Sequence, residues 1–156
     1  WRTWGQGPRR AVGIHAGLLQ SGAWERVAAC LPAGLGLLAF DMPGHGRSGP
    51  WDEARDYMDQ TVAAALGLIA DAPVDLLGHS FGAVAALRIA SERPDLVRSL
   101  VLYEPVFFAA AEARGTDTRA PNAGFAAALA AGDREEAARC FTEVWGAASA
   151  GRTRRP

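Results

Sequence analysis

The sequence contains little of what metal-binding and disulfide-rich proteins depend on. Its 156 residues include only two cysteines, Cys30 and Cys140, and neither belongs to a Cys-x-x-Cys pair or a Cys/His cluster. Such spacing is typical of zinc sites and of disulfide frameworks, and its absence argues against both. Because both cysteines fall in segments of helical pattern, we expect two buried free thiols, no metal site and no cofactor.

Long apolar runs and a charge imbalance are also missing. No stretch of 18 or more apolar residues occurs, which predicts that no helix spans a membrane. No basic segment followed by an apolar run marks a signal peptide. With 16 basic and 17 acidic residues, the formal net charge is -1, so the overall charge does not favour nucleic acid or an anionic membrane as a partner. We expect a cytoplasmic protein that acts on a small molecule.

Apolar residues are instead arranged in short runs, separated by segments of helical spacing. The composition, 49% hydrophobic and 21% charged, is that of one globular domain with a sizeable core. The apolar runs predict buried strands at residues 11–15, 36–40, 74–77 and 99–103. The helical spacing predicts helices at residues 22–31, 57–69, 81–92 and 133–145. Strands that alternate with helices predict an α/β fold with a mostly parallel sheet and flanking helices.

The character of the sequence changes at about Pro105. Beyond it the chain is rich in alanine and helical in pattern, with turn signals but no further strand. The final residues are basic and carry no structural pattern. We therefore predict three parts: an α/β part at residues 1–105, a helical part at residues 106–146 and an irregular basic tail at residues 147–156.

One short motif carries chemistry. Gly78-His79-Ser80-Phe81-Gly82 directly follows a predicted strand and directly opens a predicted helix. A serine hydroxyl is a poor nucleophile, so it needs exposure at a sharp turn, a base, and donors for the developing negative charge. The two glycines let the strand end and the helix begin without steric conflict, which holds the serine strained and exposed. The motif and its context predict a nucleophile elbow.

Three blocks of the sequence resemble the α/β-hydrolase family, over most of residues 4–145. His15-Ala16-Gly17 resembles the family's oxyanion loop. Residues 41–48, Asp-Met-Pro-Gly-His-Gly-Arg-Ser, resemble the loop after the following strand. The third block is the elbow, followed by residues 98–105, which resemble the family's sixth strand. The resemblance implies an α/β-hydrolase fold of which this chain is the N-terminal portion, with a partial helical cap after the sixth strand.

The resemblance also implies roles for individual residues. Ser80 is the expected nucleophile, and the backbone N–H groups of Gly17 and Phe81 are the expected oxyanion donors. Ala16 stands where the family more often has glycine, which shifts the expected backbone freedom of the loop to Gly17.

The resemblance gives this chain no complete catalytic triad. His15 and His45 are expected to shape their loops, and His79 is expected to point away from the pocket. Glu104 is the one candidate acid, at a position that some relatives use, but this position is also a common strand exit without catalytic duty. In the family the acid and the histidine follow the serine. Both are therefore expected beyond residue 156, in a relative of roughly 250 residues.

We expect the parent protein to be a serine hydrolase of the carboxylic-ester-hydrolase type, acting on an ester or related acyl substrate. This chain is then an incomplete and inactive fragment. Trp1 in place of Met suggests a missing N-terminus, and the abrupt change after Trp145 suggests an interrupted or frame-shifted reading. The alternative is a non-catalytic, ligand-binding protein of the same fold.

A fragment of this kind leaves sheet edges without partners. The strand at residues 99–103 would end the sheet on one side, and missing N-terminal strands would expose the other side. Edge strands offer free N–H and C=O groups to other chains, so we expect self-association.

Overall fold

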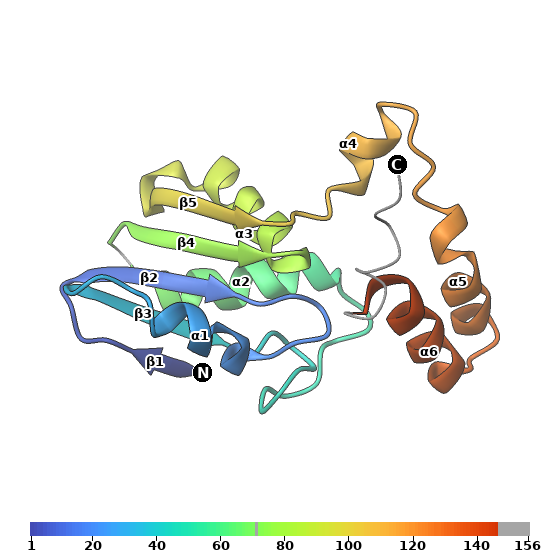
Figure 1. The fold of residues 1–156 in the computed structure, drawn as a ribbon, viewed down its shortest axis with the longest axis horizontal. Helices are drawn as coiled ribbons and strands as arrows, with labels where there is room; N and C mark the ends of the chain where they lie inside the picture. The colour runs from blue at the N-terminus through green and yellow to red at the C-terminus, as the bar shows by residue number, and fades with distance from the viewer. Residues whose placement is uncertain (71, 147–156) are drawn as a thin grey trace. The chain divides into compact units, whose positions relative to one another are not determined.

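The computed structural model describes residues 1–70 and 72–146, which divide into two compact units (Figure 1). The first unit covers residues 1–106, and the described part of the second covers residues 107–146. The predicted basic tail, residues 147–156, lies outside the described residues. The first unit combines a sheet with helices, whereas the described part of the second unit contains helices alone.

A five-stranded sheet forms the centre of the first unit, in the order β1-β3-β2-β4-β5. The strands are β1 (Arg2–Trp4), β2 (Arg9–Ile14), β3 (Leu35–Phe40), β4 (Val74–His79) and β5 (Val97–Tyr103). β2 pairs in parallel with both β3 and β4, and β4 pairs in parallel with β5. The prediction of a mostly parallel sheet is confirmed, and each of the predicted strands corresponds to one of its members.

β1 is a strand that the sequence pattern does not predict. It pairs antiparallel with β3, with Thr3 opposite Leu38. A strand of three residues has too few alternating positions to be recognised from its periodicity. β1 therefore covers β3 and is itself the terminal strand on that side of the described sheet.

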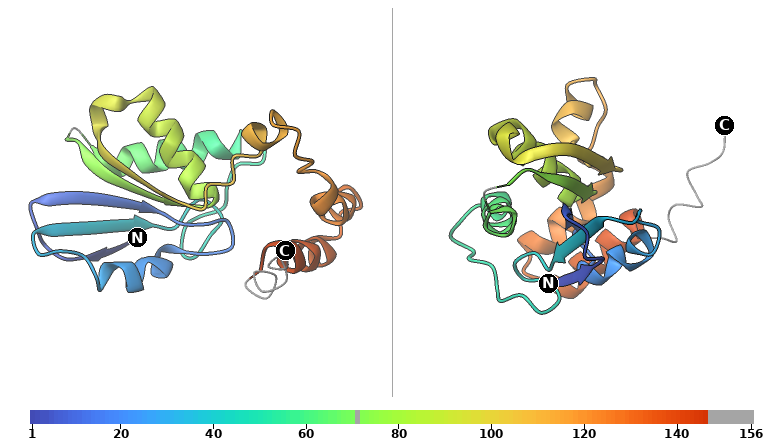
Figure 2. Two further views of the ribbon diagram at one scale, coloured as in Figure 1. Left: turned by 45° about the horizontal axis from the view of Figure 1, so that its top comes forward. Right: turned by 90° about the vertical axis from the view of Figure 1, so that its left-hand side faces the viewer.

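Helices cover both faces of the sheet (Figure 2). α2 (Tyr57–Ile69) and α3 (Phe81–Glu92) lie on one face, at the positions that the sequence predicts. The short 3-10 helix η1 (Ser21–Trp24) and α1 (Glu25–Ala28) lie on the other face. The two faces are thus shielded by helices from different parts of the chain.

The segment between β2 and β3 is less helical than its spacing predicts. α1 ends at Ala28, and the Cys30 N–H donates to the Val27 carbonyl at 3.0 Å, in a turn closed over three residues. Such turns are tighter than an α-helix and are used in short pieces. Cys30 is consequently exposed, and Cys140 in the second unit is half-buried, so the expectation of two buried thiols was wrong.

The alternation of side chains along the strands builds two apolar cores. On the α2 and α3 face, the fully buried residues of the strands include Val12, Ile14 and Leu76. On the opposite face Trp24 fills the space over Gly13, where an added Cβ would lie 3.0 Å from the indole ring. Both faces are therefore packed at the carboxyl ends of β2 and β4, where the predicted site residues follow.

The second unit has little core of its own. Its helices are α4 (Phe108–Glu112), the 3-10 helix η3 (Ala120–Asn122), α5 (Ala123–Ala130) and α6 (Arg134–Trp145). α5 and α6 pack through the rings of Phe125 and Phe141, whose centroids are 5.4 Å apart. Within residues 107–146, Ala128 and Ala137 are the buried apolar residues. α6 matches the helix predicted at residues 133–145, and its role in a cap remains a prediction.

Across residues 1–70 and 72–146, none of the helices combines the length and the apolar character that crossing a membrane requires.

Candidate active site

Ser80 occupies a strained turn between the end of β4 and the start of α3. Its φ of 54° and ψ of -116° lie outside the regions that residues with a Cβ favour. Its N–H donates to the Tyr103 carbonyl at 2.9 Å, and its own carbonyl accepts from Ala83 at 3.0 Å. The turn is therefore tied to the end of β5 on one side and to the first turn of α3 on the other.

The glycines on either side of Ser80 are required because backbone atoms approach them closely. A Cβ on Gly78 would lie 2.4 Å from the Cα of Ala83. A Cβ on Gly82 would lie 2.3 Å from the carbonyl oxygen of Ile14 and 2.4 Å from that of His15. These contacts bring the first turn of α3 directly against the end of β2. We name residues 78–82 the elbow.

The segment after β2, residues 15–21, begins with a turn around Gly17, and we name it the Gly17 loop. The Ala16 carbonyl accepts a hydrogen bond from the Leu19 N–H at 2.9 Å, which closes this turn. Gly17 does not have a left-handed φ, and an added Cβ would meet nothing within 4 Å. Gly17 therefore adopts a backbone conformation that other residues can also adopt.

The two predicted oxyanion donors follow neighbouring strands of the sheet. β2 and β4 pair in parallel, with Ile14 opposite Gly78. Gly17 lies three residues after Ile14, and Phe81 lies three residues after Gly78. Within the described part of the chain, neither the Gly17 N–H nor the Phe81 N–H is paired with an acceptor.

A second loop, residues 41–48 after β3, holds the Gly17 loop by hydrogen bonds. We name it the Asp41 loop. The buried Asp41 carboxylate accepts from the Ser21 N–H at 2.7 Å, and it also accepts from the Arg47 N–H at 3.0 Å. Burial by itself raises the pKa of Asp41, but these two N–H donors outweigh it and lower the pKa to about 2. The carboxylate therefore stays ionised and links the two loops.

Both ring nitrogens of His15 form hydrogen bonds that hold the same two loops together. Its Nδ1 lies 2.8 Å from the Ala16 carbonyl, and its Nε2 accepts from the Met42 N–H at 3.0 Å. Because a carbonyl only accepts, the proton sits on Nδ1 and the ring is neutral. Burial lowers the pKa of His15, which keeps the ring neutral. His15 thus has no free nitrogen to act as a base.

His45 and His79 are engaged elsewhere. The Nε2 of His45 lies 2.5 Å from the Gly17 carbonyl, and its Nδ1 lies 3.1 Å from the Tyr57 hydroxyl. The half-buried His79 ring packs on Tyr103, with centroids 4.8 Å apart. Within residues 1–70 and 72–146, no histidine forms a hydrogen bond with the Ser80 side chain.

Glu104 follows β5 at a second strained position, with a φ of 45°. It is exposed and comes directly after Tyr103, whose carbonyl binds the Ser80 N–H. Burial lowers the pKa of His79, and the Glu104 charge partly offsets this effect. Glu104 is therefore near the elbow along the end of β5, and its catalytic use remains a prediction.

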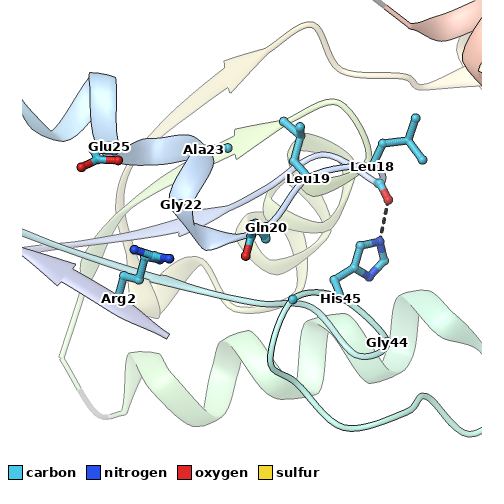
Figure 3. Close-up of a pocket in the computed structure, with 11 residues that line it drawn as sticks. Arg2, Leu18, Leu19, Gln20, Gly22, Ala23, Glu25, Gly44 and His45 are labelled. Atoms are coloured by element: carbon cyan, nitrogen blue, oxygen red, sulfur yellow. Dashed lines mark hydrogen bonds between the residues drawn. The ribbon is translucent and has the colours of Figure 1, made fainter.

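An open pocket of about 780 Å³ lies beside the Gly17 loop (Figure 3). Its wall includes Leu18 and Leu19 from that loop, together with Arg2 and Glu25. In Figure 3 a dashed line joins His45 to the carbonyl next to Leu18, which belongs to Gly17. The pocket offers an apolar wall and two opposite charges next to a predicted oxyanion donor.

No cluster of three or more His, Cys, Asp or Glu side chains among the described residues is arranged to hold a metal ion. The site offers a serine hydroxyl on a strained turn and backbone N–H groups without protein acceptors among the described residues, and their use in catalysis remains a prediction.

Comparison with known sequences assigns the chain to a family. A model of the alpha/beta hydrolase family matches residues 11–155. Lipase LipV of Mycobacterium tuberculosis is 41% identical over 102 residues, which make up 64% of this chain and 38% of the lipase. A pimeloyl-[acyl-carrier protein] methyl ester esterase of Neisseria meningitidis is 46% identical over 74 residues, 46% of this chain and 27% of the esterase. The chain spans well under half the length of either relative.

Solved structures show the same fold. The thioesterase domain from the curacin biosynthetic pathway is 37% identical, with a TM-score of 0.59, over 64% of this chain and 39% of that domain. A monoacylglycerol lipase of Paleococcus ferrophilus is 27% identical, with a TM-score of 0.60, over 76% of this chain and 51% of the lipase. In both cases the match covers more of this chain than of the solved structure.

Proposed function

Because the chain belongs to the α/β-hydrolase family, we propose that it carries the nucleophile and the oxyanion donors of a serine hydrolase. Ser80 attacks the carbonyl carbon of an ester or related acyl substrate. The N–H groups of Gly17 and Phe81 bind the oxyanion that forms. The substrate in this proposal is a small acyl compound, and the protein is cytoplasmic.

The approach of Gly82 to the end of β2 is the observation that carries this proposal. A Cβ on Gly82 would lie 2.3 Å from the Ile14 carbonyl oxygen and 2.4 Å from that of His15, so only glycine fits here. This contact brings the segments that carry the Phe81 and Gly17 N–H groups next to each other. Two backbone donors on adjacent segments, unpaired among the described residues and beside a strained serine, support a role in acyl transfer.

The names of the relatives support the choice of substrate class. The matched proteins are a lipase, a methyl ester esterase and a thioesterase domain. Each of these names describes the transfer of an acyl group from an oxygen or a sulfur atom. We therefore place the substrate among esters and thioesters of this general kind.

We place the general base on a residue other than His15, His45 and His79, and the acid that pairs with that base beside it. His15 and His45 both use their ring nitrogens to hold loops, and His79 packs on Tyr103. A serine without a base has only its own weak nucleophilicity. We propose that the 156-residue chain alone is inactive and that the full-length protein supplies the missing groups.

A fluorophosphonate probe, which reacts with activated serines, tests this assignment. In the full-length protein we expect labelling that Ser80→Ala abolishes. Ser91→Ala, an exposed serine on the same helix, is the matched control and should leave labelling unchanged. The 156-residue chain should remain unlabelled. Equal labelling of the Ser80→Ala protein would place the nucleophile elsewhere.

A ligand-binding role is the competing outcome of the same experiment. If the full-length protein resists the probe and hydrolyses no p-nitrophenyl ester, the enzyme proposal fails. Binding of an acyl compound by that inactive protein, measured by calorimetry, would then favour the non-catalytic alternative.

Self-association through the sheet is a further part of the proposal. β5 is a terminal strand of the described sheet, and its Val101 and Tyr103 side chains are 54% and 59% exposed. Exposed apolar edges promote pairing between chains. We expect the 156-residue chain to elute as more than a monomer in size-exclusion chromatography at high concentration, and a clean monomer would count against this.

A further inference from the structure

Gly17 is held in place by its hydrogen bonds rather than by packing. A Cβ at this position would meet nothing within 4 Å, so no neighbouring side chain restricts its backbone. Glycine also samples a wider range of φ and ψ than any other residue. The direction of its N–H therefore depends on how the two flanking peptide units are fixed.

The peptide unit before Gly17 is fixed through the Ala16 carbonyl. This carbonyl accepts from the Leu19 N–H at 2.9 Å, and the His15 ring donates to it from Nδ1 at 2.8 Å. Because the Ala16 carbonyl and the Gly17 N–H belong to one planar peptide unit, these bonds orient the N–H as well.

The peptide unit after Gly17 is fixed by His45. The Nε2 of His45 lies 2.5 Å from the Gly17 carbonyl, and this oxygen can only accept, so the ring donates from Nε2. Its Nδ1 lies 3.0 Å from the Pro43 carbonyl and 3.1 Å from the Tyr57 hydroxyl. Two histidines therefore hold the two peptide units on either side of Gly17.

Tyr57 links this arrangement to the elbow. Its hydroxyl donates to the Pro43 carbonyl at 2.9 Å and lies 3.1 Å from the His45 Nδ1, and its ring packs on Phe81 with centroids 5.4 Å apart. Burial raises the pKa of the Tyr57 hydroxyl, so the hydroxyl stays protonated and able to donate. One side chain thus contacts both the residue that orients Gly17 and the residue that carries the second donor.

We infer that His45, in contact with Tyr57, is a positioning residue: it fixes the Gly17–Leu18 peptide unit, and with the Ala16–Gly17 unit held on the other side this limits rotation about the Gly17 backbone and keeps the Gly17 N–H aimed at the oxyanion. This inference rests on the proposed function. It assigns His45 no contact with the substrate carbonyl. Its effect is on the transition state, because an oxyanion donor that points away no longer stabilises the developing charge.

The test compares variants of the full-length protein in the hydrolysis of p-nitrophenyl butyrate. His45→Phe removes the donor, and we expect kcat to fall by about 10- to 100-fold with KM within about twofold, since a misaimed donor loses most of its contribution. His45→Gln keeps an N–H at a similar reach and should recover most of kcat. Tyr57→Phe keeps the ring and removes the hydroxyl, and kcat should fall by about 3- to 10-fold. Arg47→Ala, an exposed side chain on the same loop, is the matched control.

A second readout follows Gly17 directly. In protein labelled with nitrogen-15 glycine, the Gly17 amide signal should shift in His45→Phe and return toward its original position in His45→Gln. Rescue by Gln would not be expected if the ring only filled space. If His45→Phe fails to fold, Tyr57→Phe and His45→Gln carry the same comparison.

The outcomes separate the two proposals. If the wild-type protein shows hydrolysis that depends on Ser80 and His45→Phe and Tyr57→Phe both keep kcat within about twofold, the positioning role is overturned and the proposed function stands. If the wild-type protein shows no Ser80-dependent hydrolysis, the proposed function fails and the catalytic role of His45 fails with it, whatever the amide signal does.

Discussion

The elbow and the Gly17 loop follow two neighbouring parallel strands, yet they are held by different forces. In the elbow, Gly78 and Gly82 are surrounded by backbone atoms within 2.5 Å of the position that a Cβ would take. Around Gly17 the same position is open space. The Gly17 loop takes its shape from hydrogen bonds that His15, Asp41 and His45 make across two loops.

The two halves of the site are therefore determined by different parts of the sequence. The elbow is specified by five consecutive residues, because close backbone contact admits only glycine at two of them. The Gly17 loop is specified by partners that lie 20 to 28 residues away in the sequence. The elbow should therefore respond to changes in side-chain volume, and the loop to changes in hydrogen bonding.

The largest expected effect comes from filling the space at Gly82. In Gly82→Ala the new Cβ would collide with the Ile14 and His15 carbonyls, and neither can move without disturbing the pairing of β2 with β4. We expect the free energy of unfolding to fall by about 3 kcal/mol. Urea denaturation measures this change.

Gly67→Ala is the matched control for this substitution. Gly67 is an exposed residue within α2, and a Cβ there would meet nothing within 4 Å. Alanine is the better helix former, so this variant should be more stable by about 0.5 to 1 kcal/mol. Equal losses in both variants would contradict the idea that close backbone contact fixes the elbow.

The sequence predicts the elbow better than the hydrogen bonds of the Gly17 loop. The elbow and the strand and helix on either side of it were predictable, because the glycine spacing and the apolar pattern are local. Within the described residues, the hydrogen bond from His45 to the Gly17 carbonyl was not, because it joins residues 28 positions apart. The pattern at residues 41–48 resembles a loop of the family without indicating which groups its side chains hold.

The structure differs from the prediction in two further places, and each difference has a local physical cause. β1 is too short to show a period, and it pairs with β3 through backbone groups that every sequence has. The segment at residues 22–31 has helical spacing over about three turns, but the structure closes it as a 3-10 helix, a short α-helix and tight turns before β3. Apolar spacing therefore located the packed face without fixing the length of the helix.

A second prediction concerns acid, which protonates Asp41 and so weakens the hydrogen bonds between the two loops. The pKa of Asp41 is about 2 in the folded chain, below its value of about 4 in an unfolded chain. The stability that this carboxylate contributes, about 2 kcal/mol, is complete above pH of about 4 and is lost as the pH falls toward about 2. Asp41→Asn should lose this amount at neutral pH, and its deficit relative to wild type should shrink over the same range.

Asp75→Asn provides the comparison for the acid experiment. The Arg9 guanidinium lowers the pKa of Asp75 to about 2, so this buried carboxylate adds a similar acid-sensitive contribution. It has no hydrogen bond to the Gly17 loop within the described residues. Both variants should flatten the pH dependence of unfolding, but only Asp41→Asn should shift the Gly17 amide signal. An unchanged signal in Asp41→Asn would mean that the loop keeps its shape without this link.

A third prediction concerns Ser80→Gly, which should relieve the strain in the elbow. The φ of 54° at Ser80 disfavours any residue with a Cβ, and glycine adopts it freely. Ser80→Gly and Ser80→Ala both remove the hydroxyl, but only the first removes the strain. We expect Ser80→Gly to unfold with a free energy about 1 kcal/mol higher than Ser80→Ala, after the greater flexibility of glycine in the unfolded chain is taken into account. Thermal unfolding of the two variants side by side measures the difference, and equal midpoints would show that the turn is unstrained.

The smallest expected effect is at Gly17. A Cβ there meets nothing and the φ is not left-handed, so Gly17→Ala should leave the free energy of unfolding within about 0.5 kcal/mol of wild type, or slightly above it. The contrast with Gly82→Ala is the sharpest form of the comparison, because the same methyl group is added to a glycine that follows each of the two neighbouring strands. A loss of more than about 2 kcal/mol in Gly17→Ala would show that packing holds this loop too. A stable variant would instead mean that any fall in its Ser80-dependent hydrolysis reports on the space in front of the oxyanion donor and not on folding.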